Sequence, residues 1–275
     1  MFGKLLKYDM KYIFRYWWIV ALTMLAFSVM GGIGYSGIIG ESQEPLVQLF
    51  AILGFLLFYF GIFAFLIYYT IMLYVRYYKH FFTDEGYLTF TLPVKRSTLL
   101  NVKLANGMIW SVLSTLMIAV AIVIFIMITF SSDPDLFSSS MYYSDPGSYD
   151  ISVAAVIIYA LEILLWLVLY LFFGHTLSYM AITIGSVVAK KHKVLTSIAI
   201  MYLTNVVMSL INSVTMIGGV FWITNVLNIM PETSELEISI ITGLFLLLIC
   251  VITAVACAIV YLITLHLLER RLNLE

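Results

Sequence analysis

The chain has 275 residues, of which 63% are hydrophobic and 11% are charged, and its mean hydropathy is +1.06. A soluble domain carries about 25% charged residues, so this composition excludes a water-soluble globular protein and predicts an integral membrane protein. The formal net charge of −1 does not identify a partner, and we expect none that is a nucleic acid. The distribution of the charges along the chain is more informative.

The fold class predicted from the apolar stretches is an all-α polytopic membrane protein with six transmembrane helices. A bilayer core requires about 20 apolar residues per helix, and residues 1–275 then form a single transmembrane domain. The expected spans are 16–40, 46–75, 104–130, 152–189, 194–217 and 238–268. The fifth apolar run continues to residue 230. We expect Gly218-Gly219 to end its crossing, which would leave 220–230 as a re-entrant segment before span six.

The basic residues are confined to alternate loops, which predicts the topology. All 14 Lys and Arg residues lie before span one, in the loops 76–103 and 190–193, or after span six, and the charged residues of the other loops are all acidic. The positive-inside rule therefore places both termini in the cytoplasm and the loop 131–151 outside the cell. Because span one is too long for a cleavable signal sequence, we expect it to be a retained signal anchor.

The segment before span one has an amphipathic helical pattern. Apolar side chains between Phe2 and Phe14 repeat at helical spacing, while Lys4, Lys7 and Lys11 fall on the other side. A basic amphipathic helix next to a span is expected to lie flat on the inner leaflet. The simpler alternative is an orientation signal alone.

Motifs for chemistry are missing from the sequence. It contains no G-x-x-x-x-G-K-[ST] phosphate loop, no H-E-x-x-H and no recognisable nucleophile motif. We therefore expect no catalytic residue, metal site or bound cofactor in this chain, and no nucleotide hydrolysis through a phosphate loop.

Polar residues inside two predicted spans are candidate functional residues. Glu162 could be protonated, bind a cationic group or couple protons, or it could be a hydrogen-bonded contact between helices. His175 is thirteen residues further along, about 20 Å on the same helix, which excludes a catalytic pair within that helix. Asn205, Ser209 and Asn212 form one polar face of span five, which either bonds to another helix or lines a water-filled path.

The cytoplasmic loop between spans two and three contains the stretch Leu92-Pro93-Val94-Lys95-Arg96-Ser97, followed by Leu99-Leu100 and Lys103. With the six spans and the basic amphipathic N-terminus, this stretch resembles the membrane subunits of type-2 ABC exporters, a bacterial permease family. The local motif is short, and the topology of the whole chain supports it.

The resemblance implies a role for the loop 76–103. In that family this loop forms a coupling helix that docks on a separate ATPase subunit. Here the helix would run from about Lys79 to Leu92 and end at Pro93, and Ser97 would cap the start of span three. The contact with the ATPase would be made by acidic and aromatic residues: Asp84, Glu85, Tyr87 and Phe90, with Phe81 and Phe82.

The resemblance also implies a dimer of two permeases, with a substrate path at their interface lined by spans two and five. Phe58, Tyr59 and Phe63 would then lie opposite the polar face of span five, and we add Glu162 to this path. An aromatic path with few charges suits a hydrophobic or amphipathic substrate, and we prefer a peptide to a lipid or a drug.

The predicted function is therefore the permease subunit of an ATP-driven exporter in a bacterial plasma membrane. The chain would be no enzyme by itself, and ATP and Mg would bind to the partner ATPase. Its partners would be that ATPase, a second permease copy, membrane lipid and the substrate. Two alternatives stay open. One is an intramembrane enzyme that uses Glu162 and needs no ATPase, and the other is a membrane immunity or sensor protein without ATP-dependent flux.

Overall fold

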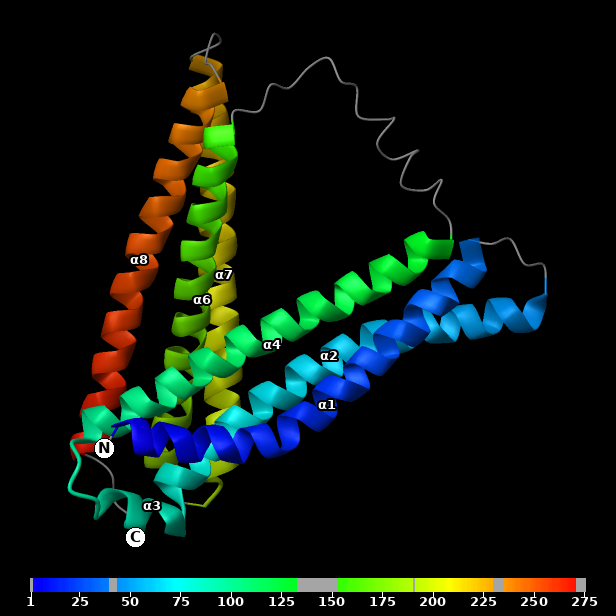
Figure 1. Ribbon diagram of the computed structural model, residues 1–275. Coiled ribbons are helices and arrows are strands. Elements are labelled where there is room, and N and C mark those ends of the chain that lie inside the picture. The colour runs from blue at the N-terminus through cyan, green and yellow to red at the C-terminus, as the bar shows by residue number, and fades with distance from the viewer. Residues whose placement is uncertain (1, 40–43, 133–152, 190, 230–234, 271–275) are drawn as a thin grey trace. The chain divides into compact units, whose positions relative to one another are not determined.

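The computed structural model describes residues 2–39, 44–132, 153–189, 191–229 and 235–270, and within these ranges the chain forms seven helices and no strand (Figure 1). The helices are α1 (Phe2–Ile39), α2 (Pro45–Phe82), α3 (Asp84–Phe90), α4 (Arg96–Ser132), α6 (Val153–Val188), α7 (Lys193–Ile229) and α8 (Glu235–Arg270).

Six of the described helices are long and apolar enough to cross a membrane, and α3 is the short exception. A helix satisfies its backbone hydrogen bonds internally, which the hydrocarbon core of a bilayer demands. The predicted class, an all-α polytopic membrane protein with six spans, is therefore confirmed. Of the predicted external loop 131–151, all but the last two residues of α4 lies outside the described residues.

Two helices extend beyond the predicted spans into the loop 76–103, which the charge pattern predicts to be cytoplasmic. α2 continues to Phe82, past the predicted end at residue 75, and α4 begins at Arg96, before the predicted start at residue 104. Charge marks where a helix leaves an apolar medium, but it does not end the helix. The N-terminal amphipathic segment is likewise continuous with span one in α1.

The expected helix end at Gly218-Gly219 is wrong. α7 passes through both glycines and reaches Ile229, so residues 220–229 continue the same helix and do not form a separate re-entrant segment. Gly219 is buried, and a Cβ atom there would collide with the ring of Phe245 on α8. The missing side chain allows close helix packing in this case and does not break the helix.

The chain divides into two compact units, a finer division than the single transmembrane domain expected from sequence. Unit 1 consists of residues 1–76 and 105–148, and unit 2 of residues 77–104 and 149–275. The division falls within α2 and α4. Each unit is described by itself below.

Unit 1 is packed through glycines and aromatic rings. A Cβ atom on Gly34 of α1 would lie 2.8 Å from the carbonyl oxygen of Ala51 on α2, so these two helices approach backbone to backbone. The indole Nε1 of Trp17 donates a 3.0 Å hydrogen bond to Ser114 of α4, and the ring of Trp17 lies 5.2 Å from that of Trp110.

An ion pair fixes the beginning of α1 to α2. The side chain of Asp9 is buried, with 3% exposed, and its Oδ1 accepts a 3.3 Å hydrogen bond from Nε of Arg76. The guanidinium of Arg76 also lies 4.3 Å from the centre of the Tyr12 ring, a cation–π contact. α1 bends in its N-terminal half, and this pair holds the first part of the bent helix (Figure 1).

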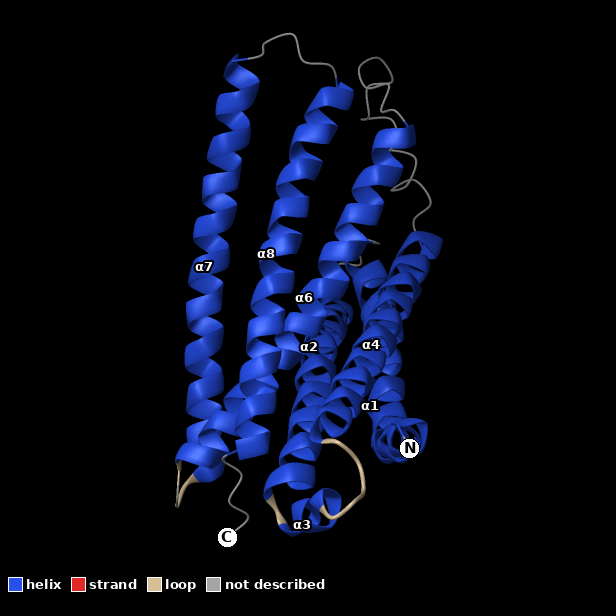
Figure 2. Cartoon of the chain, turned by 90° about the vertical axis from the view of Figure 1, so that its left-hand side faces the viewer, coloured by secondary structure: helices blue, strands red, loops and turns tan. Residues whose placement is uncertain are grey.

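In unit 2, α6, α7 and α8 lie side by side (Figure 2). Buried Phe173, Leu177 and Cys257 form the core between α6 and α8. The short α3, the end of α2 and the beginning of α4 belong to the same unit.

Removal of the Asp9 carboxylate should destabilise the protein. Asp9→Ala leaves a mostly buried guanidinium without its ion-pair partner, which costs about 3 kcal/mol. The thermal unfolding midpoint in detergent should fall accordingly. Asp84→Ala removes an exposed acid and should leave the midpoint unchanged; equal midpoints for both variants would show that the ion pair does not stabilise α1.

Candidate functional site

α3 is shorter than predicted and packs against the end of α2. Residues 79–82, expected to start this helix, belong to α2, and α3 begins after Thr83, which has an extended conformation with φ −121° and ψ −172°. A Cβ atom on Gly86 would lie 2.7 Å from the carbonyl oxygen of Phe81. Glycine at this position therefore allows α3 to fold back closely on α2.

One face of α3 is exposed and carries most of the predicted ATPase contacts. Asp84, Glu85 and Tyr87 are exposed, while Gly86 and Thr89 are buried. Leu88 belongs to the same exposed face, with 69% of its surface accessible against 65% for Tyr87. Sequence reasoning missed Leu88, although its spacing of three from Glu85 and four from Asp84 was a readable signal.

Two aromatic residues of the predicted contact point inward. Phe81, expected to be exposed, is fully buried, and its ring lies 5.6 Å from that of the half-buried Phe90. These rings hold α3 on α2. Their assignment to the ATPase contact is wrong for Phe81, because it has no accessible surface to offer.

Arg96 ties the chain after α3 to the end of α8. Its Nη1 donates hydrogen bonds to the carbonyl oxygens of Leu268 and Glu269, the latter at 2.7 Å, and its guanidinium lies 5.4 Å from the ring of Phe90. These carbonyls belong to the last turn of α8, where helix carbonyls lack intrahelical partners. A cation is favoured there by the helix dipole.

The predicted cap of α4 at Ser97 is wrong. The carbonyl oxygen of Lys95 accepts the backbone amides of Thr98 at 2.9 Å and Leu99 at 3.3 Å. Lys95 therefore occupies the N-cap position, and Ser97 lies inside the first turn of α4, which begins at Arg96. The sequence signal was ambiguous because Ser97 is only two residues from the true cap.

Tyr77 and Tyr179 connect both flanks of α3 to α6, and we call them the tyrosine junction. Their rings are stacked, with centres 4.1 Å apart and planes 12° from parallel. The hydroxyl of Tyr77 shares a 2.8 Å hydrogen bond with Thr183, and the hydroxyl of Tyr179 donates to the carbonyl oxygen of Lys103 at 3.3 Å. The end of α2 and the start of α4 thus both contact α6.

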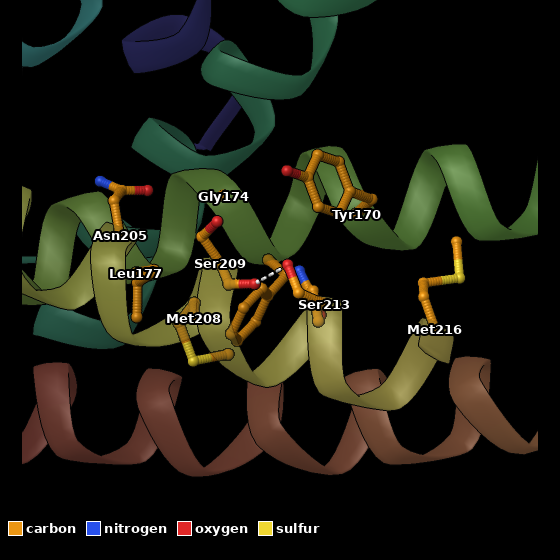
Figure 3. A pocket seen from close by; sticks show the side chains of 10 residues that line it. Tyr170, Gly174, Leu177, Asn205, Met208, Ser209, Ser213 and Met216 are labelled. Atoms are coloured by element: carbon orange, nitrogen blue, oxygen red, sulfur yellow. Dashed lines mark hydrogen bonds between the residues drawn. The ribbon is translucent and has the colours of Figure 1, made fainter. Parts of the chain in front are cut away.

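The predicted polar face of α7 lines a cavity between α6 and α7 (Figure 3). The cavity has a volume of about 540 Å³, and Asn205, Ser209 and Asn212 all contribute to it, as predicted for one helical face. The remaining lining residues are Tyr170, Phe173, Gly174, Leu177, Met208, Ser213 and Met216.

We call this cavity the polar cavity. Only some of its polar side chains form hydrogen bonds within the protein. Asn205 donates its amide to the carbonyl oxygen of Met201 at 2.7 Å, and Ser213 donates to that of Ser209 at 2.9 Å. Within the described residues, the hydroxyl of Ser209 and the amide of Asn212 have no hydrogen-bond partner. Such groups are costly in an apolar medium, so the cavity is suited to hold water or a polar ligand.

Gly174 shapes the α6 wall of the polar cavity. A Cβ atom at this position would meet no atom within 4 Å, and the residue lies across from Ser209 (Figure 3). The α6 residues were not predicted from sequence. Because Gly174 has no side chain, it leaves space in the α6 wall of the cavity.

The other predicted path residues lie elsewhere. Phe58 is buried in unit 1, stacked on Phe125 with ring centres 4.4 Å apart, so its assignment to a path is wrong for this chain. Tyr59 and Phe63 are exposed on α2. Glu162 does not line the polar cavity; its carboxylate lies against Gly243 of α8, and its Oε2 is buried without a hydrogen-bond partner among the described residues.

The described residues contain no group of three or more His, Cys, Asp or Glu side chains placed to hold a metal ion. Comparison of the chain with protein-family models, with curated proteins and with solved structures gave no match.

The reactivity of a cysteine introduced into the polar cavity should show whether the cavity contains water. Cys250 and Cys257 are buried and free, and both are first replaced by alanine. A charged methanethiosulfonate reacts only with a hydrated thiolate, so Ser209→Cys should react on the order of tenfold faster than Leu210→Cys, its exposed apolar neighbour. Adding Gly174→Leu should slow Ser209→Cys by filling the cavity; equal rates at positions 209 and 210 would contradict a wet cavity.

Proposed function

We propose that the chain is the permease subunit of an ATP-driven exporter, powered by a separate cytoplasmic ATPase. The observation that carries the proposal is α3, a short helix between two long ones. It exposes two acids, an aromatic and a leucine on one face and is fixed on its other face by Gly86, Phe81 and Phe90. Aromatic and apolar side chains presented on a fixed surface are suited to bind a protein.

ATP-driven transport by this chain would need a partner that binds the nucleotide. The chain has no phosphate loop, so in this proposal ATP and Mg are bound by the partner and not by this chain. The positive-inside rule places α3 on the cytoplasmic side, where ATP is available. The same rule favours cytoplasmic termini, and the proposal puts the chain in a bacterial plasma membrane.

The contacts of α3 suggest how a movement of the ATPase would reach the polar cavity. A push on α3 acts on the end of α2, where Tyr77 is stacked on Tyr179 of α6. It also acts on Arg96, which is bonded to the end of α8. Because α6 forms one wall of the polar cavity and packed helices move as rigid bodies, a displaced α3 would change the width of the cavity.

The lining of the polar cavity supports an uncharged, partly apolar substrate. Asparagine and serine side chains can both donate and accept hydrogen bonds, as the amides of a peptide backbone require. Met208 and Met216 are flexible apolar side chains that adapt to different partners. We therefore prefer a hydrophobic or amphipathic peptide as substrate, with a lipid or a drug as alternatives.

The proposal includes a second copy of the chain. Tyr59 and Phe63 on α2, and most apolar side chains of α7, are exposed. In the proposed homodimer, part of this surface meets the partner copy and the remainder meets lipid.

Changes on the exposed face of α3 should release the ATPase. The combined variant Tyr87→Ala/Leu88→Ala removes two exposed contacts and should cost on the order of 2 kcal/mol of docking or more. The measurement is purification from native membranes in mild detergent, followed by photolabelling of co-purified protein with an azido analogue of ATP. The labelled partner should be present with the unchanged chain and lost with the variant.

Tyr8→Ala on α1 and Tyr202→Ala on α7 remove equally exposed aromatic residues and serve as controls that should retain the partner. If the unchanged chain brings no ATP-binding protein with it, or if the α3 variant retains it fully, the proposal is wrong.

Arg96 should affect coupling without affecting docking. Arg96→Gln removes charged hydrogen bonds, each worth about 1.5–3 kcal/mol, while the exposed face of α3 is unchanged. In the complex with the ATPase, the labelling rate of Ser209→Cys should differ severalfold between the nucleotide-free and ATP-bound states, and Arg96→Gln should reduce that difference. Lys95→Gln, one residue earlier and exposed, should preserve it; an unchanged difference in Arg96→Gln would exclude this route.

A further inference from the structure

A second cavity lies at the beginning of α7 and has a different chemical character. Its volume is about 460 Å³, and its polar lining comes from Lys191, His192, Lys193 and Tyr78. None of the described residues that line it is acidic. Val194, Leu195 and Ile198 complete the lining. The basic residues precede these apolar residues along the chain, so the cavity combines a basic part with an apolar part. We call it the basic cavity.

The position of the basic residues is fixed by close packing between α6 and α7. Ser197 is buried, and its hydroxyl donates to the carbonyl oxygens of Lys193 at 2.8 Å and Ile182 at 3.2 Å. A Cβ atom on Gly185 of α6 would collide with the backbone of Ser197. The first turn of α7, which begins at Lys193, therefore cannot shift freely against α6.

The surface that leads away from the basic residues is apolar and open. Leu195 is 68% exposed, Ile198 is 55% exposed, and the exposed Tyr202 follows one turn later on the same face of α7. α7 is one of the described helices that are long and apolar enough to cross a membrane, so exposed apolar side chains on it are suited to contact lipid chains. A small soluble anion would use the basic residues only and would leave the apolar part uncovered.

We propose that the basic cavity binds one anionic phospholipid. The phosphate of the headgroup contacts Lys191 and Lys193, the hydroxyl of Tyr78 adds a hydrogen-bond donor, and one acyl chain lies along Leu195 and Ile198. Basic residues next to a span attract anionic lipids, and the apolar continuation selects a lipid over free phosphate. This site is separate from the polar cavity and does not depend on the proposed transport function.

The test is native mass spectrometry of the full chain extracted from phosphatidylcholine vesicles that contain phosphatidylglycerol, with titration of phosphatidylglycerol in detergent. The unchanged chain should retain one phosphatidylglycerol. Lys191→Gln/Lys193→Gln should weaken its apparent affinity by about fivefold for each lysine removed. Leu195→Gln/Ile198→Gln should weaken it as well, because the acyl chain loses its apolar contact.

Lys79→Gln/Lys95→Gln is the matched control, since it removes two exposed lysines that do not line the basic cavity. It should retain the lipid as the unchanged chain does. Three results would overturn the proposal: equal loss in both lysine variants, full retention by Lys191→Gln/Lys193→Gln, or displacement of phosphatidylglycerol by inorganic phosphate.

Discussion

The stacked pair of Tyr77 and Tyr179 is the contact on which the position of α3 depends. Tyr77 has no exposed surface, and its hydroxyl is bonded to Thr183 of α6. The hydroxyl of Tyr179 reaches the backbone of α4 at Lys103. α3 lies between the end of α2 and the start of α4 in the chain, and the tyrosine junction attaches both of these segments to α6. Two buried aromatic rings in close stacking bury a large apolar area in a defined geometry, so the attachment is both strong and directional.

Two further features of unit 2 bear on α3: the hydrogen bonds of Arg96 to α8 and the polar cavity beside α6. Arg96, at the start of α4, bonds to carbonyl oxygens in the last turn of α8, so the chain that follows α3 is attached to α8, which itself packs against α6. The polar cavity lies between α6 and α7, and its lining residues Phe173 and Leu177 also pack against α8. A helix next to a cavity can move into it at little cost in lost contacts. In the proposed transport cycle, this free volume would allow the width of the polar cavity to change when α3 is displaced.

Features that depend on composition and on helical periodicity could be predicted from the sequence. Contacts between side chains that are distant in the sequence could not. The six spans follow from long apolar runs, and the exposed face of Asp84, Glu85 and Tyr87 follows from charge next to a membrane. The polar face of α7 follows from helical spacing. The sequence could not show that Phe58 is stacked on Phe125 or that Phe81 is buried, because an aromatic residue has the same signature in a core and on a surface. The sequence also could not distinguish a glycine that ends a helix from one that allows an aromatic ring to pack closely against the helix, as the ring of Phe245 packs against Gly219.

The central claim is that the exposed face of α3 binds an ATPase. It is tested most directly by replacing Leu88 with the photo-crosslinking residue benzoylphenylalanine in native membranes. The account predicts one dominant adduct, formed with a protein that an azido analogue of ATP also labels, and no such adduct when the same residue replaces Tyr202 on α7. An ATP-binding adduct missing at position 88, or formed equally at position 202, would contradict it.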